Sequence, residues 1–481
     1  MTMGGATGSV PVVSGPLPGR SVTVGGAFDL EGLGYLEEEF FVAGVGRSFR
    51  MAGPRGSDGA WAVETAATAP FTTRLLVRRP ADPARFNGTV LVEWLNVSAG
   101  ADGSPEWSFA HRHLVREGFA WVGVSAQRAG IDGGGLVEGL HLKKADPERY
   151  APLDHPGDAF AYDIFTQAGR VLRTPNGASP LAPLGPQRLV AAGESQSAAF
   201  LVTYINAIDP LDPVYQGFLV HGRGGSGAGL AGFGTEEPEG GAAPGGPDRS
   251  AIRRAGERIR ADVRVPVLTV QSETDVVALG GWLARQPDAD RHRLWEIAGS
   301  AHGDTYLLVA AAQDSGSLEP AALAELLRPT TETFVGTTDL PVNAGPQQHY
   351  VLQAAISHLE RWIRDGTAPP TADRLELLEG GAGLVPDEHG IAKGGVRTPW
   401  VDVPTARLSG LGQTGAGFAF LFGTTEPFDP RELARAYPGG KGEYLERFAR
   451  SLADAVEAGF LLAADVAEIE AIAAAGFDER S

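Results

Sequence analysis

The sequence predicts an α/β fold: a mostly parallel sheet with helices on both faces. Two observations support this prediction. Short apolar segments alternate with helical patterns through the first three quarters of the chain. Several of these segments are apolar without interruption, as expected of strands that are buried on both faces. The 481 residues are 43% hydrophobic and 21% charged, which is typical of a globular protein with a substantial core.

The sequence pattern of the first part of the chain predicts an N-terminal hairpin followed by alternating strands and helices. Residues 1–20 have no periodic pattern, and we expect them to be disordered. A helix is indicated between Pro105 and Gly118, because proline favours the first turn of a helix and glycine favours its end. In chain order the predicted elements are residues 35–51 and 71–80 (hairpin strands), 89–97 (strand), 105–119 (helix), 120–127 (strand) and 157–173 (helix).

The same alternation continues to residue 302 and is followed by an amphipathic helix. That last helix places Leu352, Leu359 and Trp362 on one face, so we expect it to pack on the sheet. In chain order the predicted elements are residues 187–193 (strand), 195–208 (helix), 215–222, 265–275 and 292–302 (strands) and 349–366 (helix).

Residues 21–481 are expected to form a single domain with two additions. A stretch rich in glycine and proline, about 222–262, interrupts the alternation between two core strands and is either a lid or a disordered insertion. A C-terminal extension, about 367–481, is expected to pack on the core. We find no internal repeat.

Composition excludes several classes of function. A formal net charge of −19 argues against binding to nucleic acids or anionic membranes, both of which require a basic surface. No apolar run approaches the roughly 20 residues of a membrane helix, and residues 1–20 do not resemble a signal peptide. We therefore expect a cytoplasmic protein with a small-molecule partner, and the sequence does not indicate its oligomeric state. Because there is no cysteine, disulfides, thiolate metal sites and a cysteine nucleophile are excluded.

The segment Gly193-Glu194-Ser195-Gln196-Ser197 lies between a predicted strand and a predicted helix. A serine at such a tight turn, a nucleophile elbow, is lifted clear of the sheet, and the positions two residues before and after it must be small. Gly193 and Ser197 meet that requirement, although Ser197 replaces the usual second glycine. We therefore interpret Ser195 as the nucleophile and Ser197 as a packing residue. Alone, this pattern is weak evidence.

A serine nucleophile needs an imidazole base, and the base needs a carboxylate that fixes its tautomer. Asp275 and His302 each follow a later predicted strand, so both are expected on loops at the same edge of the sheet as Ser195. Glu273 competes with Asp275 for the role of the acid, but the spacing of QSETD favours Asp275. The order serine, aspartate, histidine is the order found in α/β-hydrolases.

The sequence resembles the α/β-hydrolases, and within them a large bacterial family known as α/β-hydrolase domain proteins. The segments that carry the resemblance are VLVEWLNVSAG, GFAWVGVSAQ, AAGESQSA, VQSETDV, WEIAGSAHGD and GGVRTPWVDVPTA. The resemblance implies an α/β-hydrolase fold and a Ser-Asp-His serine hydrolase that cleaves carboxylic esters without a cofactor. The same triad also serves thioesterases, lactonases and acyltransferases. A non-catalytic protein that binds a small molecule, and a metallohydrolase, are the alternatives from other classes.

A tetrahedral intermediate requires preorganised N–H donors at the developing oxyanion. The backbone N–H of Gln196, directly after the nucleophile, is one candidate. The second is expected from the loop after residues 89–95, where Asn96 is preferred and Val97 is the alternative. Glu194 and His221 are candidate substrate-binding residues, although Glu194 could equally face solvent.

No metal site is expected. His111 and His113 are two residues apart on a predicted helix and therefore point in different directions, unlike the i,i+4 pair of a zinc site. Asp304, which follows His302 by two residues, is expected to cap a helix, and the alternative is that it holds the loop.

Overall fold

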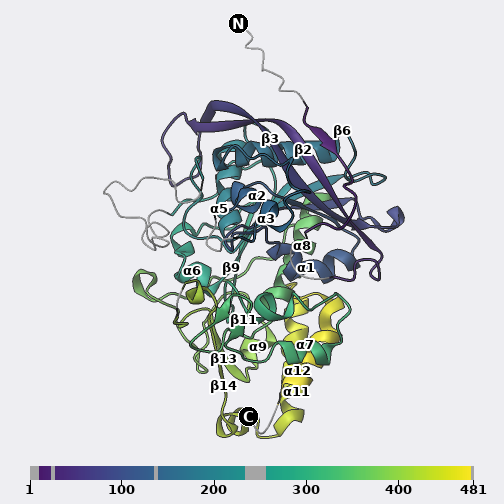
Figure 1. Cartoon of the computed structure of the whole chain (residues 1–481). Helices are drawn as coiled ribbons and strands as arrows, with labels where there is room; N and C mark the ends of the chain where they lie inside the picture. Colours follow the sequence, from purple (N-terminus) through teal and green to yellow (C-terminus); the bar gives the residue numbers. More distant parts are fainter. Residues whose placement is uncertain (1–9, 23–27, 135–138, 233–255, 416, 478–481) are drawn as a thin grey trace.

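The structure is a computed structural model that describes residues 10–22, 28–134, 139–232, 256–415 and 417–477 (Figure 1). Its centre is a ten-stranded sheet in the order β10-β9-β8-β7-β4-β5-β3-β2-β1-β6. Two small two-stranded sheets, β11-β12 and β13-β14, lie outside it.

The strands are β1 (Val12–Ser14), β2 (Tyr35–Met51), β3 (Val63–Pro80), β4 (Thr89–Trp94), β5 (Ala120–Val124), β6 (Asn176–Gly177), β7 (Arg188–Glu194), β8 (Gly217–His221), β9 (Val267–Ser272), β10 (His292–Ile297), β11 (Glu332–Thr333), β12 (Gly336–Thr337), β13 (Ala406–Ser409) and β14 (Thr424–Pro427). The α-helices are α1 (Pro105–Arg116), α2 (Arg128–Asp132), α3 (Leu142–Ala145), α4 (Ala161–Arg173), α5 (Gln196–Thr203), α6 (Glu273–Val277), α7 (Pro320–Leu326), α8 (Gln347–Asp365), α9 (Pro399–Asp402), α10 (Pro430–Ala436), α11 (Gly440–Glu457) and α12 (Val466–Gly476).

The predicted mostly parallel sheet and its leading hairpin are confirmed. Strands β10, β9, β8, β7, β4 and β5 are parallel to one another. Strand β3 then pairs antiparallel with β5, and β3 and β2 form a long antiparallel pair. Because parallel strands point the same way, the residues that follow β7, β9 and β10 lie along one edge of the sheet. That edge holds the candidate site described below.

Alternation along β4 shows how the sheet is covered on both faces. Val92 and Trp94 belong to a buried apolar cluster that includes residues of α4 and α5. Leu91 and Leu95 point the other way and join a cluster that includes residues of α1 and α8. Each such side chain contributes about 1.5–3 kcal/mol when it is fully buried. The uninterrupted apolar segments of the sequence are therefore strands between two helical layers.

Several local predictions are wrong. Residues 12–14 lie within the segment expected to be disordered, yet they form β1 on the edge of β2, where Val13 is buried. Four strands are shorter than predicted: those expected at residues 89–97, 120–127, 265–275 and 292–302 end at Trp94, Val124, Ser272 and Ile297. The Ser272 hydroxyl accepts from the Asp275 N–H, and the Asp275 carboxylate accepts from the Ser272 N–H, so a capping box starts helix α6.

The glycine- and proline-rich insertion is only partly described. Residues 233–255 lie outside the described residues, so the lid interpretation cannot be placed on the structure. Its two flanks approach each other, since the N–H of Glu257 donates to the carbonyl of Gly225 (2.9 Å).

Within the described residues, no helix is both long and apolar enough to cross a membrane.

The buried side chains of the C-terminal extension pack in the same apolar core as those of the sheet. Figure 1 shows α11 and α12 at the end of the molecule away from β2 and β3. Phe448 of α11 and Ile469 of α12 belong to the same apolar cluster as Trp295 of β10 and Leu359 of α8. The extension and the helical layer over this face of the sheet therefore have a common core.

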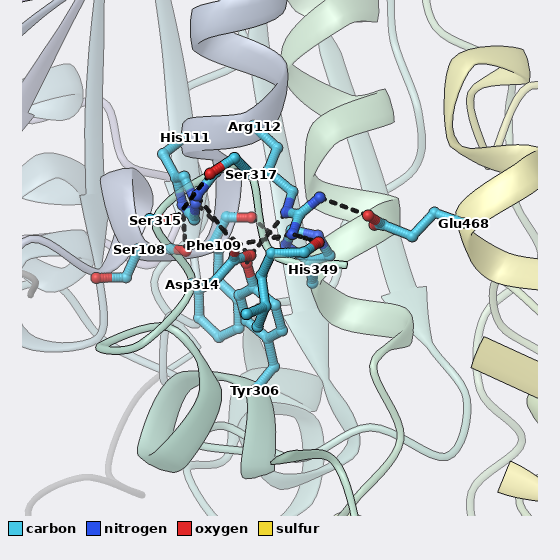
Figure 2. Close-up of polar contacts among 12 residues, drawn as sticks. Ser108, Phe109, His111, Arg112, Tyr306, Asp314, Ser315, Ser317, His349 and Glu468 are labelled. Atoms are coloured by element: carbon cyan, nitrogen blue, oxygen red, sulfur yellow. Dashed lines mark hydrogen bonds and ion pairs between the residues drawn. The ribbon is translucent and has the colours of Figure 1, made fainter. Parts of the chain in front are cut away.

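A buried polar network also links α1 to the later part of the chain (Figure 2). The Arg112 guanidinium donates to Asp314 (2.7 Å) and to Glu468 of α12, and the Tyr306 hydroxyl donates to Asp314 (2.9 Å). The Asp314 side chain has no exposed surface. Burial opposes its ionisation, but His111 and Arg112 hold the pKa of Asp314 well below its ordinary value. Asp314 is therefore an ionised acid at the centre of this network.

Asp314→Asn is expected to lower the free energy of unfolding by about 3 kcal/mol, because it removes one of the two carboxylates that neutralise the largely buried Arg112 charge. Urea denaturation measures this loss. The matched control is Glu325→Gln, whose ion pair with Arg328 is exposed and should change stability by less than about 0.5 kcal/mol. Equal effects of the two substitutions would contradict a structural role for the network.

Candidate active site

Ser195 occupies the turn between β7 and α5. Its backbone angles are φ 60° and ψ −118°, and it is the only non-glycine residue with a positive φ among the described residues. Such a conformation costs about 1–3 kcal/mol and persists only where the surrounding structure imposes it. The Ser195 N–H donates to the carbonyl of His221 on β8 (3.0 Å), which anchors the turn.

The turn brings strand and helix close together, as the small residues in the sequence predict. A Cβ atom on Gly193 would lie 2.9 Å from the carbonyl oxygen of Ser197 and 3.2 Å from its Cβ. A side chain at position 193 would therefore force the turn apart. Ser197 is fully buried, and its hydroxyl has no hydrogen-bond partner within the described residues. Ser197 therefore lies at the packed contact, as the sequence predicts.

His302 and Asp275 lie beside Ser195. The Nε2 atom of His302 is 2.8 Å from the Ser195 Oγ, and its Nδ1 atom is 2.6 Å from the Asp275 Oδ1. Asp275 is held from the other side, since its Oδ2 accepts from the N–H (2.6 Å) and the hydroxyl (2.8 Å) of Ser272. His302 follows β10 in a loop, as predicted, whereas Asp275 lies in the first turn of α6.

Glu273, the competing acid, has a different environment. Its carboxylate accepts from the N–H of Gly299 (2.6 Å) and of Gly410 (2.8 Å). Burial raises the pKa of Glu273 to about 7, although these N–H groups oppose the rise. Glu273 therefore joins the loop before His302 to the C-terminal extension and makes no hydrogen bond to the imidazole.

Glu194 does not face solvent. Its side chain is buried, and its Oε1 lies 3.0 Å from the Nε2 of His302. The Asn96 amide donates to the other oxygen, Oε2, at 3.2 Å. Burial raises the pKa of Glu194 to about 7, although His302 opposes this rise. Burial also disfavours the imidazolium, but Glu194 and Asp275 together raise the pKa of His302 to about 9.

Asn96 has no N–H left for an oxyanion, which corrects the prediction. Its backbone N–H donates to the carbonyl of Gly103 (2.9 Å), and its side-chain amide donates to the carbonyl and carboxylate of Glu194 (3.1 and 3.2 Å). Within the described residues, the N–H groups of Val97 and Gln196 donate to no protein acceptor. Val97, the alternative, is therefore the better candidate, together with Gln196 at the first position of α5.

His221 lies at the end of β8, directly opposite Glu194 of β7. Its Nδ1 is 3.4 Å from the Oε1 of Glu106, a buried residue of α1. Burial disfavours the imidazolium, but Glu106 and Glu194 raise the pKa of His221. Asp304 accepts from the N–H of Leu307 (3.0 Å), just before the helical turn Tyr306–Ala310, whose N-cap position is Thr305.

Sequence reasoning missed Glu106. An acid in the first turn of a helix is ordinarily explained by the helix dipole, and nothing in the sequence indicates that this one is buried beside a strand-end histidine. The same reasoning left the direction of Glu194 open.

The two histidines of α1 point to different surroundings, as predicted. His111 contacts the Ser108 carbonyl (3.1 Å) and lies 3.6 Å from Asp314. His113 packs on Phe119, and burial together with Arg116 lowers the pKa of His113 to about 3. In the described parts of the chain, no group of three or more His, Asp or Glu side chains is arranged to hold a metal ion.

Comparison with known proteins places residues 7–471 in one family model, described as "Alpha/beta hydrolase domain". Among proteins with curated functional descriptions, none matches the sequence significantly. Solved structures with a similar fold include a serine hydrolase without a lid from Xanthomonas campestris (15% identity, 52% of this chain and 83% of that chain, TM-score 0.27). A glucuronoyl esterase from Solibacter usitatus (11%, 60% and 83%, 0.28) and a thermostable esterase from Pseudomonas putida (13%, 62% and 82%, 0.30) are also similar. These TM-scores are too low to support a conclusion about the activity of this chain.

Proposed function

Because the chain belongs to the α/β-hydrolase domain family, we propose that it is a serine hydrolase that cleaves carboxylic esters of small molecules. One observation carries the proposal: the continuous hydrogen-bonded series from Ser195 through His302 to Asp275. A serine hydroxyl becomes an effective nucleophile when a base of this kind takes its proton. The strained turn at Ser195 supports the same conclusion, since such strain concentrates at functional sites.

In the proposed reaction, the Ser195 Oγ attacks the ester carbonyl carbon while His302 Nε2 takes the hydroxyl proton. The tetrahedral intermediate then expels the alcohol, to which His302 returns the proton, and an acyl-enzyme remains on Ser195. Water, activated by His302, attacks that acyl group and releases the acid. Asp275 keeps Nδ1 protonated, so that Nε2 is the basic nitrogen, and stabilises the imidazolium.

The N–H groups of Gln196 and Val97 are the proposed oxyanion donors. Neither is used within the described residues, and Gln196 stands at the N-terminus of α5, where the helix dipole favours negative charge. Removing one such donor typically costs about 100–1,000-fold in kcat.

Hydrolysis of p-nitrophenyl butyrate by the purified chain tests the proposed function. We expect this hydrolysis to persist in the presence of EDTA. At equal substrate concentration it should be faster than hydrolysis of a thioester or a lactone, and faster than transfer of the acyl group to an added alcohol. Loss of activity with EDTA would favour a metallohydrolase instead. No turnover of any ester by folded protein would contradict the proposal and favour a non-catalytic binding protein.

A further inference from the structure

The Nε2 atom of His302 has two close neighbours. Besides the Ser195 Oγ at 2.8 Å, the carboxylate oxygen Oε1 of Glu194 lies at 3.0 Å. Nε2 carries either one proton or one lone pair. A base must direct its lone pair toward the serine hydroxyl, whereas a carboxylate at this distance requires a proton between the two atoms. Glu194 therefore competes with the Ser195 hydroxyl for His302 Nε2, the nitrogen that acts as the base in the proposed reaction.

The position of Glu194 is fixed by its surroundings. It is the last residue of β7, its side chain is buried, and Asn96 donates to its second oxygen. Gly222 approaches so closely that a Cβ on it would lie 3.4 Å from Glu194 Oε1 and 3.2 Å from the His302 ring. The carboxylate is therefore confined against the imidazole.

The charged groups around this pair come from several elements. Asp275 of α6 faces the opposite side of His302, and His221 of β8 faces Glu194. Behind His221 lie Glu106 of α1 and Asp304 of the loop after His302. In the described structure, no arginine or lysine contacts Glu194 or His302, so His302 and His221 are the cationic groups available to Glu194.

We propose that Glu194 is a positioning residue that holds His302 in a resting state through a proton shared at Nε2, and that the site becomes competent when this proton leaves. Loss of the proton to solvent frees the Nε2 lone pair, which then accepts the Ser195 hydroxyl proton. This inference rests on the proposed function, in which His302 is the base. It predicts an enzyme that is most active at alkaline pH.

Electrostatics give the direction of the pH dependence. Burial disfavours the imidazolium, but Glu194 and Asp275 raise the pKa of His302 to about 9, while burial raises that of Glu194 to about 7. The raised pKa of His302 means that the pair keeps its shared proton at neutral pH and loses it as the pH becomes alkaline. A neutral group in place of Glu194 removes one of the two charges that favour the imidazolium, so the pKa of His302 must fall.

Glu194→Gln tests the proposal through the pH profile of kcat/KM for p-nitrophenyl butyrate. We expect the midpoint of the acid limb to move down by at least about one unit, so that relative activity at pH 7 rises about tenfold. Glu194→Asp keeps a carboxylate and should retain an alkaline profile. Glu273→Gln, which removes a buried carboxylate without contact to His302, is the matched control and should leave the midpoint unchanged. Midpoints of Glu194→Gln and the unmodified enzyme within about 0.3 unit would overturn the proposal.

A second measurement separates this inference from the proposed function. The His302 Cε1–Hε1 signal, assigned by its loss in His302→Gln, can be titrated by NMR in Ser195→Ala protein without any substrate. Adding Glu194→Gln should lower that midpoint by at least about one unit. If no ester is hydrolysed, the proposed function is wrong, but the titration still shows whether Glu194 raises the pKa of His302. An unchanged midpoint would reject Glu194 as the partner of His302 and leave the proposed function standing.

Discussion

Ser195→Ala is expected to lower kcat for p-nitrophenyl butyrate by about 10,000-fold or more. The hydroxyl that is lost is the one bonded to His302, and no neighbouring group can form the acyl-enzyme in its place. What remains is the contribution of the oxyanion donors and of substrate binding. Steady-state kinetics of the purified variant measure the loss, and circular dichroism checks its fold.

Ser197→Ala is the matched control for this prediction. It removes a hydroxyl of the same kind two residues away, one that is buried and has no hydrogen-bond partner within the described residues. Its kcat should stay within about tenfold of the unmodified enzyme. The assignment is wrong if Ser195→Ala stays within tenfold of the unmodified enzyme or if the Ser197 variant is the inactive one.

Asp275→Asn carries the second largest expected effect, a loss of about 1,000- to 10,000-fold in kcat. The Asp275 Oδ1 lies 2.6 Å from His302 Nδ1, so the carboxylate keeps that nitrogen protonated. An asparagine with its amide toward the ring would favour the other tautomer, in which Nε2 carries the proton and cannot act as the base. Because Ser272 also holds Asp275, the fold must be verified by a urea denaturation curve.

Glu273→Gln separates the two acids of α6. Its carboxylate accepts two backbone N–H bonds and makes no hydrogen bond to His302, so we expect a stability loss of about 1–3 kcal/mol with kcat within tenfold of the unmodified enzyme. A larger loss of kcat from Glu273→Gln than from Asp275→Asn would reverse the assignment made from the sequence.

The sequence was sufficient to place Ser195, Asp275 and His302 together, for a physical reason. Each follows an apolar segment that is recognisable as a buried strand, and in a parallel sheet the carboxyl ends of such strands lie along one edge. Neither the exact distance between the side chains nor the start of α6 was needed for this prediction. The close contact of Gly193 with Ser197 follows from the same turn.

What could not be predicted depends on contacts between segments far apart in the sequence. The Asn96 backbone N–H donates to the Gly103 carbonyl, and its side-chain amide donates to the Glu194 carboxylate. Both contacts depend on the path of a loop that the sequence does not define. The orientation of Glu194 toward His302 depends on how closely the loop after β10 approaches β7. Strand β1 forms because the edge of β2 is available to pair with it, which a local pattern does not reveal.

The central claim is that Ser195 is a nucleophile activated by His302, and reaction with a fluorophosphonate probe tests it most directly. Mass spectrometry of the digested protein should locate a single adduct on Ser195, absent in Ser195→Ala and formed far more slowly in His302→Gln. An adduct on another residue, or none on folded protein at alkaline pH, would contradict the account.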